Sequence, residues 1–131
     1  RATMFGAPTH PLDVAVDHAT AEELLGADYG QNILIAESLN DGSAEDCARV
    51  VKRVRKKLTG KNQKVIQLAL ALVETLMKNC QFNLHVQVGH KDFMAAMTPL
   101  AEGKKGFDVQ KKALELVQQW GLAFRSERLA E

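Results

Sequence analysis

The sequence predicts an all-helical domain, built as a right-handed superhelix of seven to eight helices. Apolar residues recur at three- and four-residue steps, the spacing of one helix face, and alternating strand patterns are absent. The three prolines, Pro8, Pro11 and Pro99, leave residues 12–98 without the residue that most disfavours a helix interior. Short amphipathic helices of this kind pack as stacked antiparallel pairs, and no repeat of fixed period indicates a regular solenoid.

The first part of the chain is divided by capping residues and turns. Pro11 suits the first turn of a helix, and Thr20 and Glu23 have the capping-box spacing that predicts a short helical turn. Asp28 is placed to cap a helix that ends before turn-forming residues. The elements expected here are an extended arm over residues 1–10, a helix from residue 11, a helical turn at 21–25 and a helix at 29–40.

The two central helices differ in their apolar pattern. Ser43 and Asp46 open a helix that runs to about Thr59 and carries one apolar stripe. Asn62 caps a helix over residues 63–80 that is apolar nearly all round, which indicates burial on most sides. This second helix is therefore the expected centre of the domain.

Three further helices are expected in the last third of the chain. Gly89 separates the first two, Pro99 bends or closes the second, and Asp108 caps the third. The expected elements are helices at residues 82–88, 91–101 and 108–124, with the start of an eighth helix at 127–131.

Length, hydropathy and cysteine content place the chain in a broad class. Its 131 residues are enough for one domain, and no apolar stretch approaches the 18 residues of a transmembrane helix. The N-terminus lacks a signal-peptide pattern, and the two cysteines do not form a disulfide scaffold. A reducing, cytosolic location is therefore expected.

Residue patterns for catalysis or metal binding are absent. The sequence contains no C-x-x-C, H-E-x-x-H or glycine-rich phosphate-binding motif. His85 and His90 are five residues apart, which does not place both on one helix face. Cys47 and Cys80 occupy predicted core positions, where a thiol acts as a small hydrophobe. We therefore expect no enzymatic activity, no cofactor and no metal site.

Charge is divided unevenly along the chain. Residues 47–64 contain eight bases and no acid. Residues 1–46 contain one base, Arg1, and nine acids, which are Asp13, Asp17, Glu22, Glu23, Asp28, Glu37, Asp41, Glu45 and Asp46. This asymmetry predicts either partner binding or ion pairing between the two segments.

Several segments, in order over residues 11–126, resemble the VHS domain family, and its Target-of-Myb branch most. The run E-T-x-x-K-N-C followed by F-x-x-H is the most specific of them. The matching segments are PLDVAVDHAT at 11–20, Asp28–Tyr29, ETLMKNC at 74–80, Phe82-x-x-His85, KDFM at 91–94, LVQQW at 116–120 and AFRS at 123–126.

The resemblance implies an eight-helix superhelix of the ENTH/VHS type. It also implies a non-enzymatic adaptor of endosomal cargo sorting, cytoplasmic and peripherally associated with endosomal or Golgi-derived membranes. Several VHS domains bind ubiquitin through a Trp on the second helix and an aliphatic residue four positions later. The matching positions are Tyr29 and Ile33, with neighbouring exposed residues of the fourth helix.

Two physical features agree with a ubiquitin site there. Residues four apart share a helix face, and the acidic N-terminal third favours encounter with a partner whose apolar patch has a basic rim. In the alternative interpretation, Tyr29 only begins the helix and Ile33 faces the core.

The GGA branch of the family instead binds acidic dileucine sorting signals between its sixth and eighth helices. Lys91 and Phe93 match part of that groove, but the sixth helix is only loosely similar and the eighth is not present in full. We therefore do not expect dileucine signals to bind, and we expect Phe93 to lie in the core.

The basic segment has three interpretations of its own. Its bases face away from the apolar stripe and could pair with the acidic N-terminal helices, leaving a purely structural role in a longer protein. Nucleic acid is not expected, because no aromatic residues are interleaved for base stacking. A cationic helix face could also bind anionic phospholipids, phosphoinositides included. The residues for lipid binding would be Lys52, Arg53, Lys56, Lys57 and Lys61.

Overall fold

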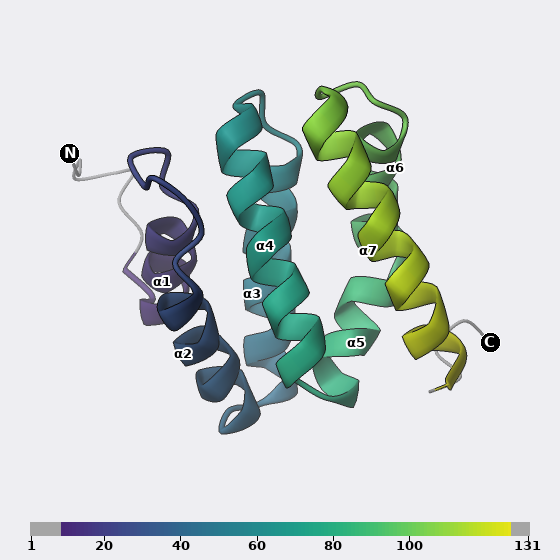
Figure 1. Ribbon diagram of the computed structural model, residues 1–131. Helices are drawn as coiled ribbons and strands as arrows, with labels where there is room; N and C mark the ends of the chain where they lie inside the picture. Colours follow the sequence, from purple (N-terminus) through teal and green to yellow (C-terminus); the bar gives the residue numbers. More distant parts are fainter. Residues whose placement is uncertain (1–8, 127–131) are drawn as a thin grey trace.

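The structure, a computed structural model, describes residues 9–126, and over that range it contains α-helices and no strand. The helices α2, α4 and α7 lie side by side on one face of the molecule, with α1, α3 and α6 behind them (Figure 1). This arrangement confirms the predicted all-helical superhelix. The helices are α1 (Pro11–Ala19), α2 (Tyr29–Asn40), α3 (Ala44–Leu58), α4 (Gln63–Asn79), α5 (Phe82–Gly89), α6 (Lys91–Ala101) and α7 (Phe107–Ser126).

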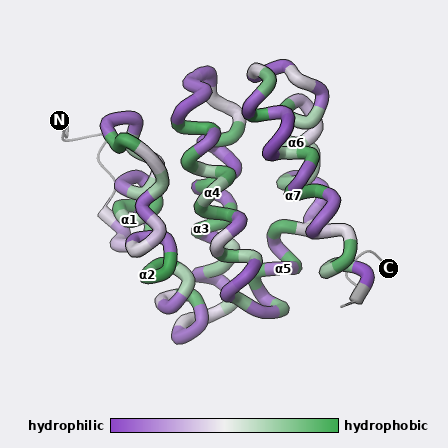
Figure 2. The backbone as a smooth tube through the Cα atoms, viewed as in Figure 1, coloured by the Kyte–Doolittle hydropathy of each residue, from purple (hydrophilic) through white to green (hydrophobic). Residues whose placement is uncertain are grey.

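Helix α4 is the element on which the others pack. It contacts α2, α3, α5 and α7, and touches α1 as well. Figure 2 shows hydrophobic residues along much of its length. Each buried leucine contributes roughly 1.5–3 kcal/mol to folding. The prediction of a buried central helix is confirmed by its fully buried side chains, which are Ile66, Ala69, Leu70, Leu72, Val73 and Leu76.

The predicted caps of three helices are confirmed, and in the simplest of them the Asn62 side-chain oxygen accepts a hydrogen bond from the Val65 amide at 3.1 Å at the start of α4. The Asp28 carboxylate accepts a hydrogen bond from the Gln31 amide at 3.0 Å. The Ser43 hydroxyl accepts from the Asp46 amide at 3.2 Å, while the Asp46 carboxylate accepts from the Ser43 amide at 3.1 Å, completing a capping box. Local side-chain chemistry therefore sets these helix starts.

The prediction of a helical turn at residues 21–25 is wrong. Thr20 is instead the C-cap of α1, and its hydroxyl donates back to the Val16 carbonyl at 2.8 Å. Thr20 is almost fully buried in this position. The segment that follows is a turn with bends, held by a hydrogen bond from the Leu24 amide to the Ala21 carbonyl.

One further boundary, the start of α7, differs from the sequence prediction, whereas the bounds predicted for α6 are confirmed. Helix α7 begins at Phe107, directly after Gly106 with a φ of +101°, so Asp108 lies in the first turn and is not the cap. Helix α6 continues past Pro99 to Ala101, because a proline in the last turn removes only one hydrogen bond of the helix.

The predicted arm and eighth helix fall mostly outside the described residues. Of the arm, only Thr9 and His10 are described, and the His10 Nδ1 atom accepts a hydrogen bond from the Leu12 amide at 3.1 Å to cap α1. The segment 127–131 lies entirely outside them. Across the described helices, none combines the length and apolar character needed to cross a bilayer.

Ion pairs join the acidic first helix to the basic third helix. The Asp17 carboxylate accepts hydrogen bonds from Arg53 Nε at 3.0 Å and Nη2 at 2.6 Å, and lies 2.9 Å from Lys57 Nζ. Asp13 lies 3.4 Å from Arg49. Partial burial acts to raise the pKa of Asp17, but the hydrogen bonds from Arg53 and Lys57 outweigh it and lower the pKa below its ordinary value of 3.8.

Replacing Asp17→Asn removes the charge that holds α1 on α3. We expect the free energy of unfolding at pH 7 to fall by about 1–2 kcal/mol in urea titrations. Because the folded-state pKa lies below 3.8, the stabilisation is complete above that value and is lost as the pH falls below it.

The control is Glu23→Gln in the exposed turn. We expect it to leave the free energy of unfolding unchanged at pH 7 and below pH 3.8. Equal stability of Asp17→Asn and the unchanged chain at pH 7 would contradict the ion pair's role.

Candidate functional site

Tyr29 and Ile33 lie on the outer surface of α2. Their exposed fractions are 61% and 37%, so neither is a core residue. Leu34, which the sequence analysis did not single out, is 57% exposed beside them. We call Tyr29, Ile33 and Leu34 the α2 patch. Leu25, at the tip of the preceding turn, is fully exposed.

The burial of α2 explains why its apolar residues turn outward. The buried side is formed by Ile35, Ala36, Leu39 and the polar Asn32. Helix geometry then places positions 33 and 34 away from that side. A helix with apolar residues on both sides has no single stripe, so the sequence pattern alone did not show which side is buried. Once Ile35 and Leu39 are placed on the buried side of the helix, helix geometry places Leu34 on the exposed side.

The surroundings of the α2 patch are acidic. The segment 2–48 contains no lysine or arginine. The exposed carboxylates around α2 and its preceding turn are those of Glu22, Glu23, Asp28, Glu37 and Asp41.

Helix α4 borders the same face of the molecule. The side-chain amide of Asn62, its cap, donates to Glu22 at 3.1 Å, and the Asn40 side chain donates to the Asn79 carbonyl at 2.8 Å. These contacts fix the C-terminal end of α2, and the turn that precedes α2, against α4. On α4 itself, Gln67 is exposed and Ala71 is half-buried.

The basic residues divide into two groups. Arg53 and Lys57 are held by Asp17, so their charges are already paired. Within the part of the chain that the structure describes, the exposed Lys52, Lys56 and Lys61 have neither an ion pair nor a hydrogen-bond partner. The expected pairing of the basic helix with the acidic N-terminal helix is thus confirmed for two of the five candidate lipid-binding residues.

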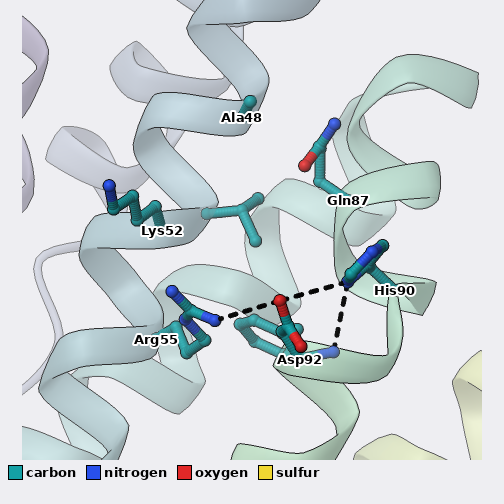
Figure 3. A pocket seen from close by; sticks show the side chains of 8 residues that line it. Ala48, Lys52, Arg55, Gln87, His90 and Asp92 are labelled. Atoms are coloured by element: carbon teal, nitrogen blue, oxygen red, sulfur yellow. Dashed lines mark hydrogen bonds and ion pairs between the residues drawn. The ribbon is translucent and has the colours of Figure 1, made fainter.

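Lys52 lines an open hollow of about 240 Å³ between α3 and the α5–α6 junction, shown in Figure 3. Arg55 also projects from α3, and His90 caps α6. The Asp92 carboxylate lies 3.7 Å from both Arg55 Nη1 and His90 Nδ1, between the two side chains. A second hollow of about 380 Å³ lies on the other side of Lys52, between α3 and α1. An anion approaching this face would therefore meet mixed charges.

Both cysteines are buried as core thiols. Burial raises the pKa of Cys47, and the neighbouring Asp46 carboxylate raises it further. Burial raises the pKa of Cys80 to about 11, and its thiol lies 3.6 Å from the Ala36 carbonyl oxygen. Over residues 9–126, no group of three or more His, Cys, Asp and Glu side chains is placed to hold a metal ion.

Phe93 also lies in the core, as the sequence predicted. It is 1% exposed and its ring lies 6.2 Å from that of Trp120, with the planes tilted by 55°. This residue is not available for recognition of a sorting signal.

Comparison with known sequences gives a consistent set of relatives. A family model of the VHS domain matches residues 6–131. The chain is 42% identical to TOM1-like protein 6 of Arabidopsis thaliana over 113 residues, which are 85% of this chain and 16% of that protein. It is 32% identical to the Target of Myb1 membrane trafficking protein of Mus musculus over 128 residues, 94% of this chain and 26% of that protein. The chain thus spans about a sixth to a quarter of the length of these relatives.

Solved structures give the same result. The VHS and FYVE tandem domains of HRS, described as a protein involved in membrane trafficking and signal transduction, superimpose with a TM-score of 0.78 at 26% identity. The match covers 92% of this chain and 55% of that one. An ENTH-VHS domain from Arabidopsis thaliana gives a TM-score of 0.69 at 17% identity, covering 87% of this chain and 84% of that one. This second likeness bears on the fold alone.

The buried cysteines should be slow to react with an aromatic disulfide reagent. A thiol with a pKa of about 11 is ionised to only about one part in a thousand at pH 8, and both thiols are shielded. We expect slow release of the reagent's chromophore from the folded chain and fast release of two equivalents in urea. Prompt reaction of either thiol in the folded chain would contradict this description.

Proposed function

The chain belongs to the VHS domain family, and from that premise we propose that it is a non-enzymatic adaptor module of membrane trafficking that binds ubiquitin on cargo. The location that follows from such a role is the cytoplasmic surface of endosomal or Golgi-derived membranes. Its similarity to TOM1-like proteins and to a Target of Myb1 membrane trafficking protein supports the trafficking role.

The observation that carries the proposal is the exposure of Tyr29 and Ile33. Large apolar side chains left in water at a helix surface favour contact with a partner. Tyr29 supplies a broad apolar face with a polar end, which suits an interface that is partly wet. Ile33 lies four residues later on the same side of α2, and Leu34 extends the patch.

Charge complementarity selects the partner. Ubiquitin offers an apolar patch with a basic rim, and the α2 patch is apolar with an acidic rim. Opposite charges at the margins speed encounter and orient the two surfaces. Three side chains make a small interface, so the affinity should be modest, with a dissociation constant of roughly 0.1–1 mM. Additional ubiquitin-binding domains in a longer protein would raise the effective affinity.

Replacing Tyr29→Ala tests this function, because it removes the largest apolar surface of the α2 patch. The substitution should weaken ubiquitin binding by roughly tenfold or more, as for other aromatic anchors, and a titration of the chain into isotope-labelled ubiquitin measures the loss. The matched control is Phe107→Ala, which also removes an exposed aromatic residue from the first position of a helix. Shifts that are absent at millimolar concentration, or unchanged by Tyr29→Ala, would remove ubiquitin from the proposal.

A second candidate function is contact with an anionic membrane surface. The unpaired Lys52 and Lys56 favour it, and they lie on α3, behind the face that carries α2 (Figure 1). Arg53 and Lys57 are weaker candidates because Asp17 neutralises them. The two proposed surfaces therefore do not share residues.

Vesicle sedimentation tests the membrane function with the double change Lys52→Gln and Lys56→Gln. Each base near an anionic surface contributes about 1 kcal/mol, so binding to phosphatidylserine or phosphoinositide vesicles should fall by roughly thirtyfold. The control, Lys78→Gln with Lys111→Gln, has the same net charge and should bind like the unchanged chain.

Equal losses in the two double variants would show that only net charge matters and would reject a specific membrane face. Failure to bind either ubiquitin or vesicles would leave the structural role described above.

A further inference from the structure

Gly30 lies in the middle of the α2 patch. It is the second residue of α2, it is exposed, and it follows Tyr29 directly. Positions three and four residues later lie beside it on the helix surface, and they are occupied by Ile33 and Leu34. Three exposed apolar side chains therefore surround a position that has no side chain.

The fold gives no reason for a glycine at this position. Among the described residues, only Gly103 and Gly106 have the positive φ that favours glycine, and Gly30 is not one of them. A Cβ atom added at Gly30 would meet only the Asp28 Oδ1 atom, at an ordinary contact distance of 3.5 Å. Glycine is also among the least favourable residues in a helix. The domain would therefore accommodate a side chain here and gain helix stability from it.

We infer that Gly30 forms the floor of the ubiquitin contact, where an aliphatic side chain of ubiquitin's apolar patch packs directly on the α2 backbone between Tyr29, Ile33 and Leu34. The inference rests on the proposed ubiquitin-binding function and adds a specificity-determining residue to it. Absence of a side chain is a feature that lets a partner approach a helix closely.

Dispersion forces explain why a single methyl group matters. Attraction between carbon atoms is greatest at separations of about 3.5–4.0 Å, and a gap of roughly 0.5–1 Å loses a quarter to a half of each contact. A side chain at position 30 would hold the partner away from all three surrounding residues at once. The flanking carboxylates of Asp28 and Glu37 would then also lie farther from the basic rim of the partner.

The experiment compares Gly30→Ala and Gly30→Gln in the full chain by titration into isotope-labelled ubiquitin. The dissociation constant should rise about threefold for Gly30→Ala and about tenfold for Gly30→Gln, as contacts are lost. The thermal unfolding midpoint should rise by about 2–4 °C, because alanine and glutamine favour the helix. Weaker binding by a more stable protein separates a contact role from a folding defect.

Gly121→Ala is the matched control. Gly121 is a helical glycine of α7 whose added Cβ would meet only Arg125 Nη1, at 3.6 Å. It should raise the unfolding midpoint and leave ubiquitin binding unchanged.

Tyr29→Ala separates the two possible failures. Weak binding by Tyr29→Ala with full binding by both Gly30 variants overturns the inference and leaves the proposed function intact. Full binding by Tyr29→Ala, or no binding by the unchanged chain, overturns both together.

Discussion

Burial of α4 on several sides is the constraint on which the rest of the structure depends. Nine of its 17 residues are buried, more than one apolar stripe supplies. Such a helix must be covered by neighbours on more than one side; α2 and α7 flank it and α3 lies behind it. The stacking of helix pairs follows from this requirement, and it leaves the outer sides of α2 and α3 free to meet partners.

Charge then decides what each free side offers. The acids of α1 pair with part of the basic surface of α3, so the domain neutralises some of its own asymmetry internally. What remains is an acidic margin around α2 and unpaired lysines on α3. An apolar patch inside the acidic margin is suited to a protein partner with basic edges. The unpaired lysines lie on the other layer, so the two surfaces are separate in space (Figure 1).

The sequence predicted the elements controlled by local chemistry. Caps at Asp28, Ser43 and Asn62 each depend on a residue three positions away, and all three formed. The prediction for Thr20 was wrong because this residue ends α1, with its hydroxyl donating to the Val16 carbonyl, and the capping-box spacing does not show where the preceding helix ends. The face of α2 could not be predicted either, because Asn32 is buried while Leu34 is exposed. Tertiary packing decides which side of α2 faces α4, and the spacing of apolar residues along α2 does not indicate it.

The contact between Phe93 and Trp120 joins α6 to α7 at the end of the stack farthest from α2. Trp120 is the one tryptophan of the chain and is 3% exposed. Its fluorescence therefore reports on the C-terminal helix pair, while the α1–α3 ion pairs and the α2 patch contain no such chromophore. Trp120 is therefore an intrinsic optical probe of the α6–α7 pair. Its emission distinguishes loosening of that pair from changes at α1, α2 and α3.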